Sequence, residues 1–89
     1  MKDQESKKLV KRALNVMVGG VNSPVRAYKS VGGRPLFITK GKGSRIWDAD
    51  GNEYTDFVCS WGAILLGHSD PDTVKASCNA IARGSSFGA

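Results

Sequence analysis

The stretch Gly19-Gly20-Val21-Asn22-Ser23-Pro24-Val25-Arg26 lies between a helical pattern near the N-terminus and a run of short predicted strands. Its two glycines allow backbone conformations that other residues avoid, and Pro24 fixes its own φ and favours an extended Ser23. We therefore expect a constrained loop that holds its polar side chains in a definite geometry. Arg26 is the main binding candidate, because a guanidinium can grip a carboxylate or a phosphate with two parallel hydrogen bonds. The competing interpretation is an ordinary helix-to-strand connection with a solvated arginine.

The residues before this loop predict an amphipathic helix over residues 6–17. Asp3 or Ser6 can serve as its N-cap, and Gly19 is a natural left-handed stop. Apolar side chains fall on one face of the predicted helix, at Leu9, Val10, Ala13, Leu14 and Met17.

The residues after the loop predict a small antiparallel meander. A turn is expected over residues 31–35, followed by short strands over 36–39, 44–48 and 53–58. The last two strands are separated by Asp50-Gly51-Asn52, a strong signal for a tight turn.

A second helix is predicted after Asp70. Asp70 is a favoured N-cap, Pro71 suits the first helical position, and the apolar spacing continues until Gly84. Residues 59–67, which separate the strands from this helix, are apolar and glycine-bounded but too irregular to predict an element.

Length and charge set limits on the class of protein. A chain of 89 residues makes at most one small domain with a thin core. The net charge of +5 raises the possibility of a small basic module that binds polyanions. However, the basic residues are scattered, and no aromatic-lined strand face or clustered stripe accompanies them, so nucleic-acid binding is not expected.

The two cysteines, Cys59 and Cys78, make neither a disulfide framework nor a metal site. The chain has a single histidine, His68, that could join them as a metal ligand, so we expect no metal site. No run is long enough to span a membrane, and the N-terminus lacks the apolar block of a secretory signal. We expect a soluble chain in the reducing cytoplasm.

Two further side chains, those of Trp61 and His68, are of types that occur in binding and catalytic sites. Trp61 is flanked by Ser60 and Gly62, small neighbours that leave its face open to a ligand, although a tryptophan of a core or a subunit interface would fit equally well. His68 reads as a histidine that anchors a loop, with no carboxylate or nucleophile spaced to activate it. No nucleophile or general base is evident, so no catalytic residue is assigned.

Several motifs resemble the glutamate-1-semialdehyde 2,1-aminomutases, a family of class III pyridoxal-phosphate aminotransferases. The loop and Ser60-Trp61-Gly62 favour this family, whereas the Trp-Asp-x-Asp-Gly hairpin and Leu-Gly-His are shared by many class III members. Three positions depart from the family pattern: Val18, Ala63 and Asp70. The resembling stretches are residues 19–27, 31–33, 47–54, 60–62, 66–68 and 86–89.

The resemblance implies an α/β fold. The chain would be the N-terminal helix, small antiparallel meander and following helix of a fold-type I transferase, and it would be incomplete. Residues 1–89 would form only the N-terminal segment. The large cofactor-binding domain, with its Schiff-base lysine, would lie outside it. The ending at Ser85-Ser86-Phe87-Gly88-Ala89, without a closing element, also predicts a fragment. Because the Schiff-base lysine would lie elsewhere, the resemblance implies that this fragment is inactive alone.

The resemblance also implies a reaction and site residues. The reaction is conversion of glutamate 1-semialdehyde to 5-aminolevulinate, a step of tetrapyrrole (porphyrin) biosynthesis, with pyridoxal 5'-phosphate as cofactor. Arg26 would bind the substrate carboxylate, Ser23 would be a second contact, and Trp61 would line the pocket. A homodimer is implied, in the cytoplasm or, for a plant or alga, in the plastid. The alternatives are another class III ω-aminotransferase and the small basic binding module.

Overall fold

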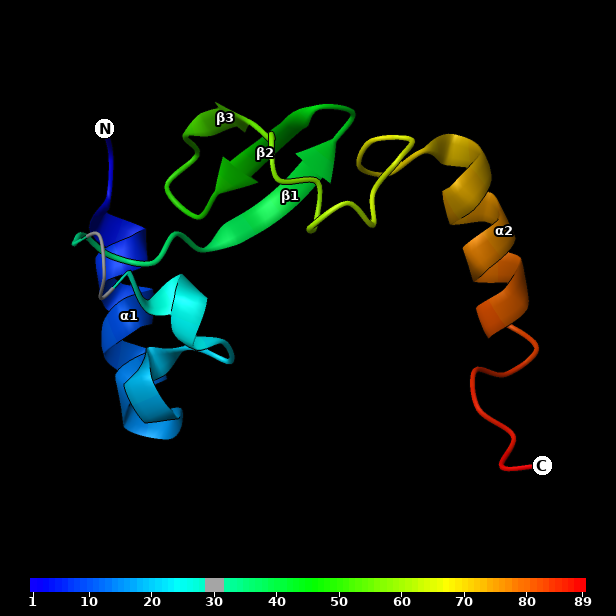
Figure 1. The fold of residues 1–89 in the computed structure, drawn as a ribbon, viewed down its shortest axis with the longest axis horizontal. Helices are drawn as coiled ribbons and strands as arrows, with labels where there is room; N and C mark the ends of the chain where they lie inside the picture. The colour runs from blue at the N-terminus through cyan, green and yellow to red at the C-terminus, as the bar shows by residue number, and fades with distance from the viewer. Residues whose placement is uncertain (29–31) are drawn as a thin grey trace.

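The computed structural model describes residues 1–28 and 32–89. An N-terminal helix and two short 3₁₀ helices precede a three-stranded sheet, and a second α-helix follows it (Figure 1). The residue Val31, at the start of the predicted turn over 31–35, lies outside the described residues. The elements in order are α1 (Gln4–Val16), η1 (Val18–Gly20), η2 (Pro24–Ala27), β1 (Ile38–Lys42), β2 (Arg45–Asp48), β3 (Glu53–Thr55) and α2 (Pro71–Ile81).

Helix α1 confirms the predicted amphipathic helix but has a different cap. Asp3 occupies the N-cap position without a side-chain cap bond. The cap comes instead from Asp50, whose Oδ1 accepts the N–H of Glu5 at 2.7 Å. Its Oδ2 accepts the N–H of Ser6 at 2.9 Å and the Ser6 hydroxyl at 2.6 Å. A carboxylate there satisfies two otherwise unpaired amides and the positive end of the helix dipole.

The sheet is the predicted antiparallel meander, in the order β1-β2-β3. Its strands differ in extent from the prediction, because Gly41 and Lys42 pair with β2 and push the turn to residues 43–44. Strand β3 ends at Thr55 rather than at residue 58. Asp56 still donates its N–H to the carbonyl of Ser44, but the N–H groups of Val58 and Cys59 hydrogen-bond to the Asp56 side chain instead of to the neighbouring strand.

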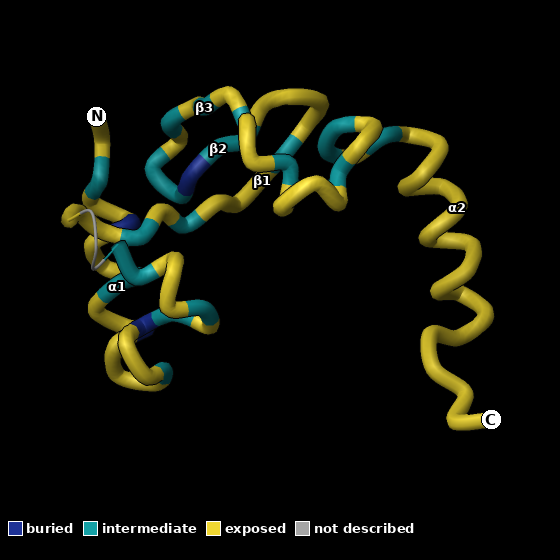
Figure 2. The backbone as a smooth tube through the Cα atoms, in the orientation of Figure 1, coloured by how far each residue is buried: buried dark blue, intermediate teal, exposed yellow. Residues whose placement is uncertain are grey.

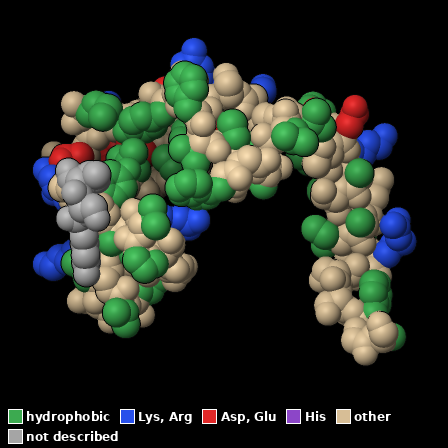
Figure 3. Space-filling view, in the orientation of Figure 1, with side chains coloured by type: hydrophobic (Ala, Val, Ile, Leu, Met, Phe, Trp, Pro, Cys, Tyr) green, Lys and Arg blue, Asp and Glu red, His purple; other side chains and the backbone are tan. Residues whose placement is uncertain are grey.

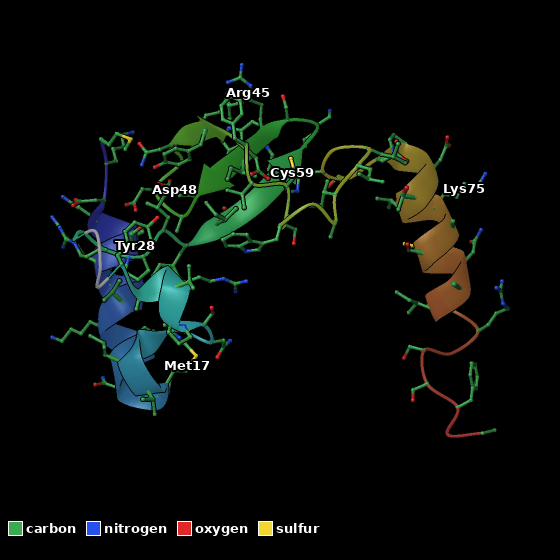
Figure 4. The ribbon with its side chains drawn as sticks, in the orientation of Figure 1. Met17, Tyr28, Arg45, Asp48, Cys59 and Lys75 are labelled. Atoms are coloured by element: carbon green, nitrogen blue, oxygen red, sulfur yellow. The ribbon has the colours of Figure 1, made fainter. Side chains whose placement is uncertain are left out.

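Asp48 is the buried polar centre of the hairpin, only 4% exposed (Figure 4). Its Oδ1 accepts the backbone N–H groups of Asp50 and Asn52 at 3.0 and 2.8 Å. Its Oδ2 accepts the Asn52 amide at 2.8 Å and the Tyr54 hydroxyl at 2.7 Å. Burial alone would raise the pKa of Asp48, but these hydrogen bonds together hold it below its usual value.

Helix α2 begins as the sequence predicts. Asp70 accepts the backbone N–H of Thr73 at 3.0 Å and its hydroxyl at 2.8 Å, and Pro71 occupies the first turn. These bonds lower the pKa of Asp70. The helix ends at Ile81, and Gly84 follows with a φ of 115°.

Little apolar surface is buried, and Figure 2 shows most of the tube as exposed. Among the described residues the only buried apolar side chain is Ala13, and none in α2 is buried. The Cα radius of gyration is 15.9 Å, against about 12 Å expected for a compact domain of this length. Helix α2 stands apart from α1, with open space between them (Figures 1 and 3). Within residues 1–28 and 32–89, no helix has the length and apolar character that crossing a membrane requires.

Candidate functional site

The glycine-rich loop is as constrained as its sequence predicts. Gly19 and Gly20 both have left-handed φ values, of 70° and 72°. Ser23 is extended, and Pro24 begins the short helix η2. The backbone N–H of Arg26 donates to the carbonyl of Ser23 at 3.0 Å, which closes the turn. The loop therefore carries Arg26 on a short helical turn anchored at its base.

Arg26 and Asn22 lie together at a cavity of about 370 Å³. Tyr28, which follows η2, and Met17, which follows α1, form part of the wall (Figure 4). Most of the remaining lining is apolar and comes from the approach to β1 and from β2: Pro35, Leu36, Phe37, Ile38 and Ile46. An apolar cavity with one guanidinium and one amide suits a short aliphatic acid, whose carboxylate would meet Arg26.

The charge of Arg26 has no carboxylate partner within the described part of the chain. The ion pairs found there involve other basic residues, and Arg26 is exposed. An exposed guanidinium at the edge of an apolar cavity is available to an acidic ligand.

Ser23 and Trp61 do not join Arg26 at this cavity. Ser23 is half-buried, and its side chain is not among the cavity-lining residues. Trp61 is 79% exposed and also lies outside the cavity lining. Of the polar residues of the loop, the structure therefore brings Arg26 and Asn22 together at the cavity. Asn22 belongs to the loop but was not predicted as a site residue.

Trp61 sits in an unusual backbone conformation. Cys59, Ser60 and Trp61 have φ values of 50°, 51° and 59°, and Gly62 continues with 89°. Residues 59–62 thus form one left-handed turn, closed by hydrogen bonds such as Gly62 N–H to Cys59 carbonyl at 3.1 Å. Each non-glycine residue in this region costs about 1–2 kcal/mol. Such strain persists only where the surrounding structure imposes it, and it gathers at functional sites.

His68 has a carboxylate partner, which corrects the sequence analysis. Its Nε2 hydrogen-bonds to Oδ2 of Asp56 at 2.6 Å. The other oxygen of Asp56 accepts the backbone N–H groups of Val58 and Cys59 at 2.9 and 3.1 Å, which ends β3. The pKa of Asp56 lies below its usual value, mainly because of the hydrogen bond from His68 and secondarily because of those from the two amides. The role as a loop anchor agrees with the sequence analysis.

A second hollow, of about 560 Å³, lies between residues 63–70 and helix α2. Leu65, Leu66 and Val74 contribute apolar surface to it, and all three are exposed. It carries no arginine or lysine. It therefore offers mainly apolar contact, without a guanidinium or ammonium group to pair with an anionic substrate.

The described residues do not fit a role in holding a cofactor or a metal. Every lysine of residues 1–28 and 32–89 is exposed, and none lines the Arg26 cavity. A lysine that forms a Schiff base needs an enclosed site that tunes its pKa. Those same ranges contain no group of three or more potential metal-ligating side chains.

Comparison with known proteins gives the family. The model of the family Aminotransferase class-III matches residues 28–88. The glutamate-1-semialdehyde 2,1-aminomutase of Thermodesulfovibrio yellowstonii is 63% identical over 89 residues, which is 100% of this chain and 21% of the relative. The enzyme of the same name from Syntrophomonas wolfei is 58% identical over the same length, again 21% of that protein.

Solved structures agree on the fold. A transaminase with PLP bound superposes with a TM-score of 0.86 at 37% identity, covering 100% of this chain and 20% of that one. The chain therefore spans about a fifth of the length of the proteins it matches. The α/β arrangement of helix, meander and helix is the partial fold expected from the sequence. The chain belongs to the class III aminotransferases.

Proposed function

We propose that this chain forms the N-terminal part of a glutamate-1-semialdehyde 2,1-aminomutase. The observation that carries the proposal is the identity of 63% and 58% to two aminomutases along the whole chain. The reaction exchanges the amino and carbonyl groups of adjacent carbons in glutamate 1-semialdehyde and gives 5-aminolevulinate for tetrapyrrole synthesis.

Arg26 is proposed to hold the substrate carboxylate. In support, Arg26 and Asn22 both line a cavity whose remaining lining is mostly apolar, and the substrate combines a carboxylate with a short aliphatic chain. A carboxylate grip of this kind acts in the ground state and the transition state alike, so it is expected to set KM more than kcat.

Ser23 and Trp61 are proposed as further substrate contacts. Ser23 precedes η2, on which Arg26 lies, and its half-buried side chain belongs to the same constrained loop. The exposed indole of Trp61 stands on the strained turn and offers a flat apolar wall. Both assignments require the complete enzyme to bring these side chains to the substrate.

The amino-group chemistry is what pyridoxal phosphate supplies when it is bound. No lysine of residues 1–28 and 32–89 lines the Arg26 cavity, and we propose that the cofactor is held mostly by polypeptide outside residues 1–89. The role left to this chain is to bind and orient the substrate, and alone it is expected to be inactive.

The complete enzyme is also proposed to be a cytoplasmic homodimer, or plastid-located in a plant or alga. Its partner is a small amino-aldehyde substrate, without nucleic acid or membrane. The apolar surface that this chain exposes, including Trp61, Leu65 and Phe57, supports extensive coverage by further polypeptide.

The test of this function is a donor-free assay of the complete enzyme. Supplied with glutamate 1-semialdehyde alone, it is expected to form 5-aminolevulinate, because the aminomutase reaction is internal to one substrate. The control adds an amino donor and an oxoacid. Turnover only in that control, with no 5-aminolevulinate, would contradict the proposal.

The second candidate is another class III aminotransferase that acts on an ω-amino substrate. It is favoured by the superposition on a transaminase with PLP bound, at 37% identity. The same assay separates the two, since such an enzyme needs a separate donor and acceptor.

A further inference from the structure

We propose that Asp56 and His68 are positioning residues for Trp61. The inference rests on the proposed function in one respect, namely that Trp61 meets the substrate. The two residues form a hydrogen-bonded chain from the sheet to the left-handed turn (residues 59–62), and this turn sets the direction in which the indole points.

The first link joins Asp56 to the turn. Its Oδ1 accepts the N–H groups of Val58 and Cys59, at 2.9 and 3.1 Å, just where the backbone enters left-handed values. Asp56 is itself anchored, because its own N–H donates to the carbonyl of Ser44 at 2.8 Å. The carboxylate therefore transfers the fixed position of the hairpin to the first residues of the turn (Figure 4, Cys59).

The second link joins Asp56 to His68. The Nε2–Oδ2 distance is 2.6 Å, and both side chains are substantially shielded from water, His68 being 22% and Asp56 10% exposed. This hydrogen bond fixes the orientation of the carboxylate, so that its other oxygen stays directed at the two amides.

His68 is held from two sides. Its backbone exchanges two hydrogen bonds with Gly43, at 2.9 and 2.8 Å. Its ring lies against Gly41, where an added Cβ would come within 2.7 Å of the ring Cγ. The absence of a side chain at Gly41 is thus what allows the imidazole to reach Asp56.

The orientation of Trp61 depends on these hydrogen bonds of Asp56 and His68, because few other contacts fix it. The side chain is 79% exposed, so packing within the described residues cannot set its orientation. Three successive non-glycine residues in left-handed conformations also need outside support. The amide contacts of Asp56 supply that support at the start of the turn.

The test is a double-mutant cycle in the complete enzyme with Asp56→Ala, Trp61→Ala and the double variant. We expect Asp56→Ala to lower kcat/KM by about tenfold to a hundredfold, the scale of a misplaced site group. The double variant should be no slower than Trp61→Ala, because Asp56 acts through the indole. Asp56→Asn keeps an oxygen that accepts the two amides, and its amide N–H can donate to Nε2 of His68 in the tautomer that carries its proton on Nδ1, so it should restore most of the rate.

A second readout does not depend on the reaction. The fluorescence of Trp61 is obtained as the difference between each variant and the same variant carrying Trp61→Phe. Asp56→Ala and His68→Phe, which keeps a ring beside Gly41, should both change this emission, whereas the matched control Asp72→Ala on α2 should not. If the wild-type enzyme fails to act on glutamate 1-semialdehyde while these shifts are seen, the proposed function falls and the positioning of Trp61 stands.

Three results would overturn the inference. One is a wild-type rate and unchanged Trp61 emission in both Asp56→Ala and His68→Phe. Another is a loss in the double variant that equals the product of the two single losses, which would make Asp56 independent of Trp61. The last is failure of both variants to give folded enzyme, because the pair would then support the scaffold rather than position one side chain.

Discussion

The N-terminal body (residues 1–28 and 32–69) and the C-terminal arm (residues 70–89) owe their structure to different interactions. In the body, hydrogen bonds connect residues far apart in sequence, such as Asp50 with Glu5 and Ser6, 45 and 44 positions away. In the arm, the side-chain bonds are local to the first turn of α2, and residues 71–89 are all exposed.

This difference shows which part of the chain is specified internally. The body's polar network selects one arrangement of α1 against the hairpin, although it buries little apolar surface. The arm has a correct cap and an amphipathic sequence but little to pack against among the described residues, and Val74, Ile81 and Phe87 are exposed. A helix of 11 residues is marginal in water without packing, so the arm needs a covering surface.

The largest expected effect comes from the arginine of the body. Arg26→Ala in the complete enzyme should raise KM for glutamate 1-semialdehyde because it removes the partner of the substrate carboxylate, at a cost of about 2–4 kcal/mol if the rest of the enzyme desolvates that ion pair. Arg83→Ala removes an exposed arginine of the arm and serves as the matched control, with KM unchanged. Equal KM values for Arg26→Ala and wild type would remove Arg26 from the site.

The next effect tests the contact between Gly41 and His68. Gly41→Ala places a methyl group within 2.7 Å of the imidazole Cγ, and overpacking of this kind costs about 1–3 kcal/mol. Chemical denaturation of the complete enzyme measures the loss. The double variant Gly41→Ala/His68→Ala makes room for the methyl group, so its loss should be smaller than the sum of the two single losses. Strict additivity would show that the contact is not the cause.

A smaller effect concerns the pH dependence of the cap on α1. Burial opposes ionisation of Asp50, but the bonds from Ser6 and Glu5 leave its pKa below the usual value. The stability that Asp50 contributes through its lowered pKa is fully present above the pKa of an aspartate in the unfolded chain, about 3.9. It is lost as the pH falls through the lower pKa of Asp50 in the folded state. Asp50→Asn should therefore destabilise the enzyme at pH 7, and the difference from wild type should vanish in stronger acid. A difference that grew on acidification would contradict the cap.

The smallest effect is expected in the arm. Val74→Ser in the isolated 89-residue chain should leave the helical circular dichroism signal nearly unchanged, because Val74 is exposed and only lines an open hollow with Leu65 and Leu66; surface substitutions typically change stability by less than about 0.5 kcal/mol. In the complete enzyme the same substitution should lower the melting temperature. Equal behaviour in both would mean that α2 stays uncovered.

Local rules predicted much of this fold. The cap and first turn of α2 at Asp70 and Pro71 and the antiparallel meander follow from residues adjacent in sequence. The predicted stop of the first helix at Gly19 was wrong, because α1 ends at Val16 with an extended Met17 and Gly19 lies in the 3₁₀ turn that follows. The ends of the strands were less accurate. Strand β3 stops early because the side chain of Asp56 accepts the amides of Val58 and Cys59, a competition that alternation of apolar residues does not reveal.

Long-range polar contacts were not predictable in the same way. The capping of α1 by Asp50 joins residues more than forty positions apart, and the partner of His68 lies 12 positions away, across the irregular segment. The sequence offered one usable signal for the second contact. Asp56 lies near the end of the predicted strand over residues 53–58, and His68 directly follows Gly67. The cavity at Arg26 and Asn22 needed the fold, because its apolar wall comes from the residues around β1 and β2.

The most direct test of the account is a thermal melt of the 89-residue chain followed by circular dichroism. The central claim is that this segment gains its cover from the rest of a longer aminotransferase. We therefore predict a shallow change without a cooperative transition, given Ala13 as the one buried apolar side chain of the described residues. A single reversible transition, with an enthalpy near the roughly 0.7 kcal/mol per residue of ordinary domains, would contradict it. Such a result would favour a self-contained binding module instead.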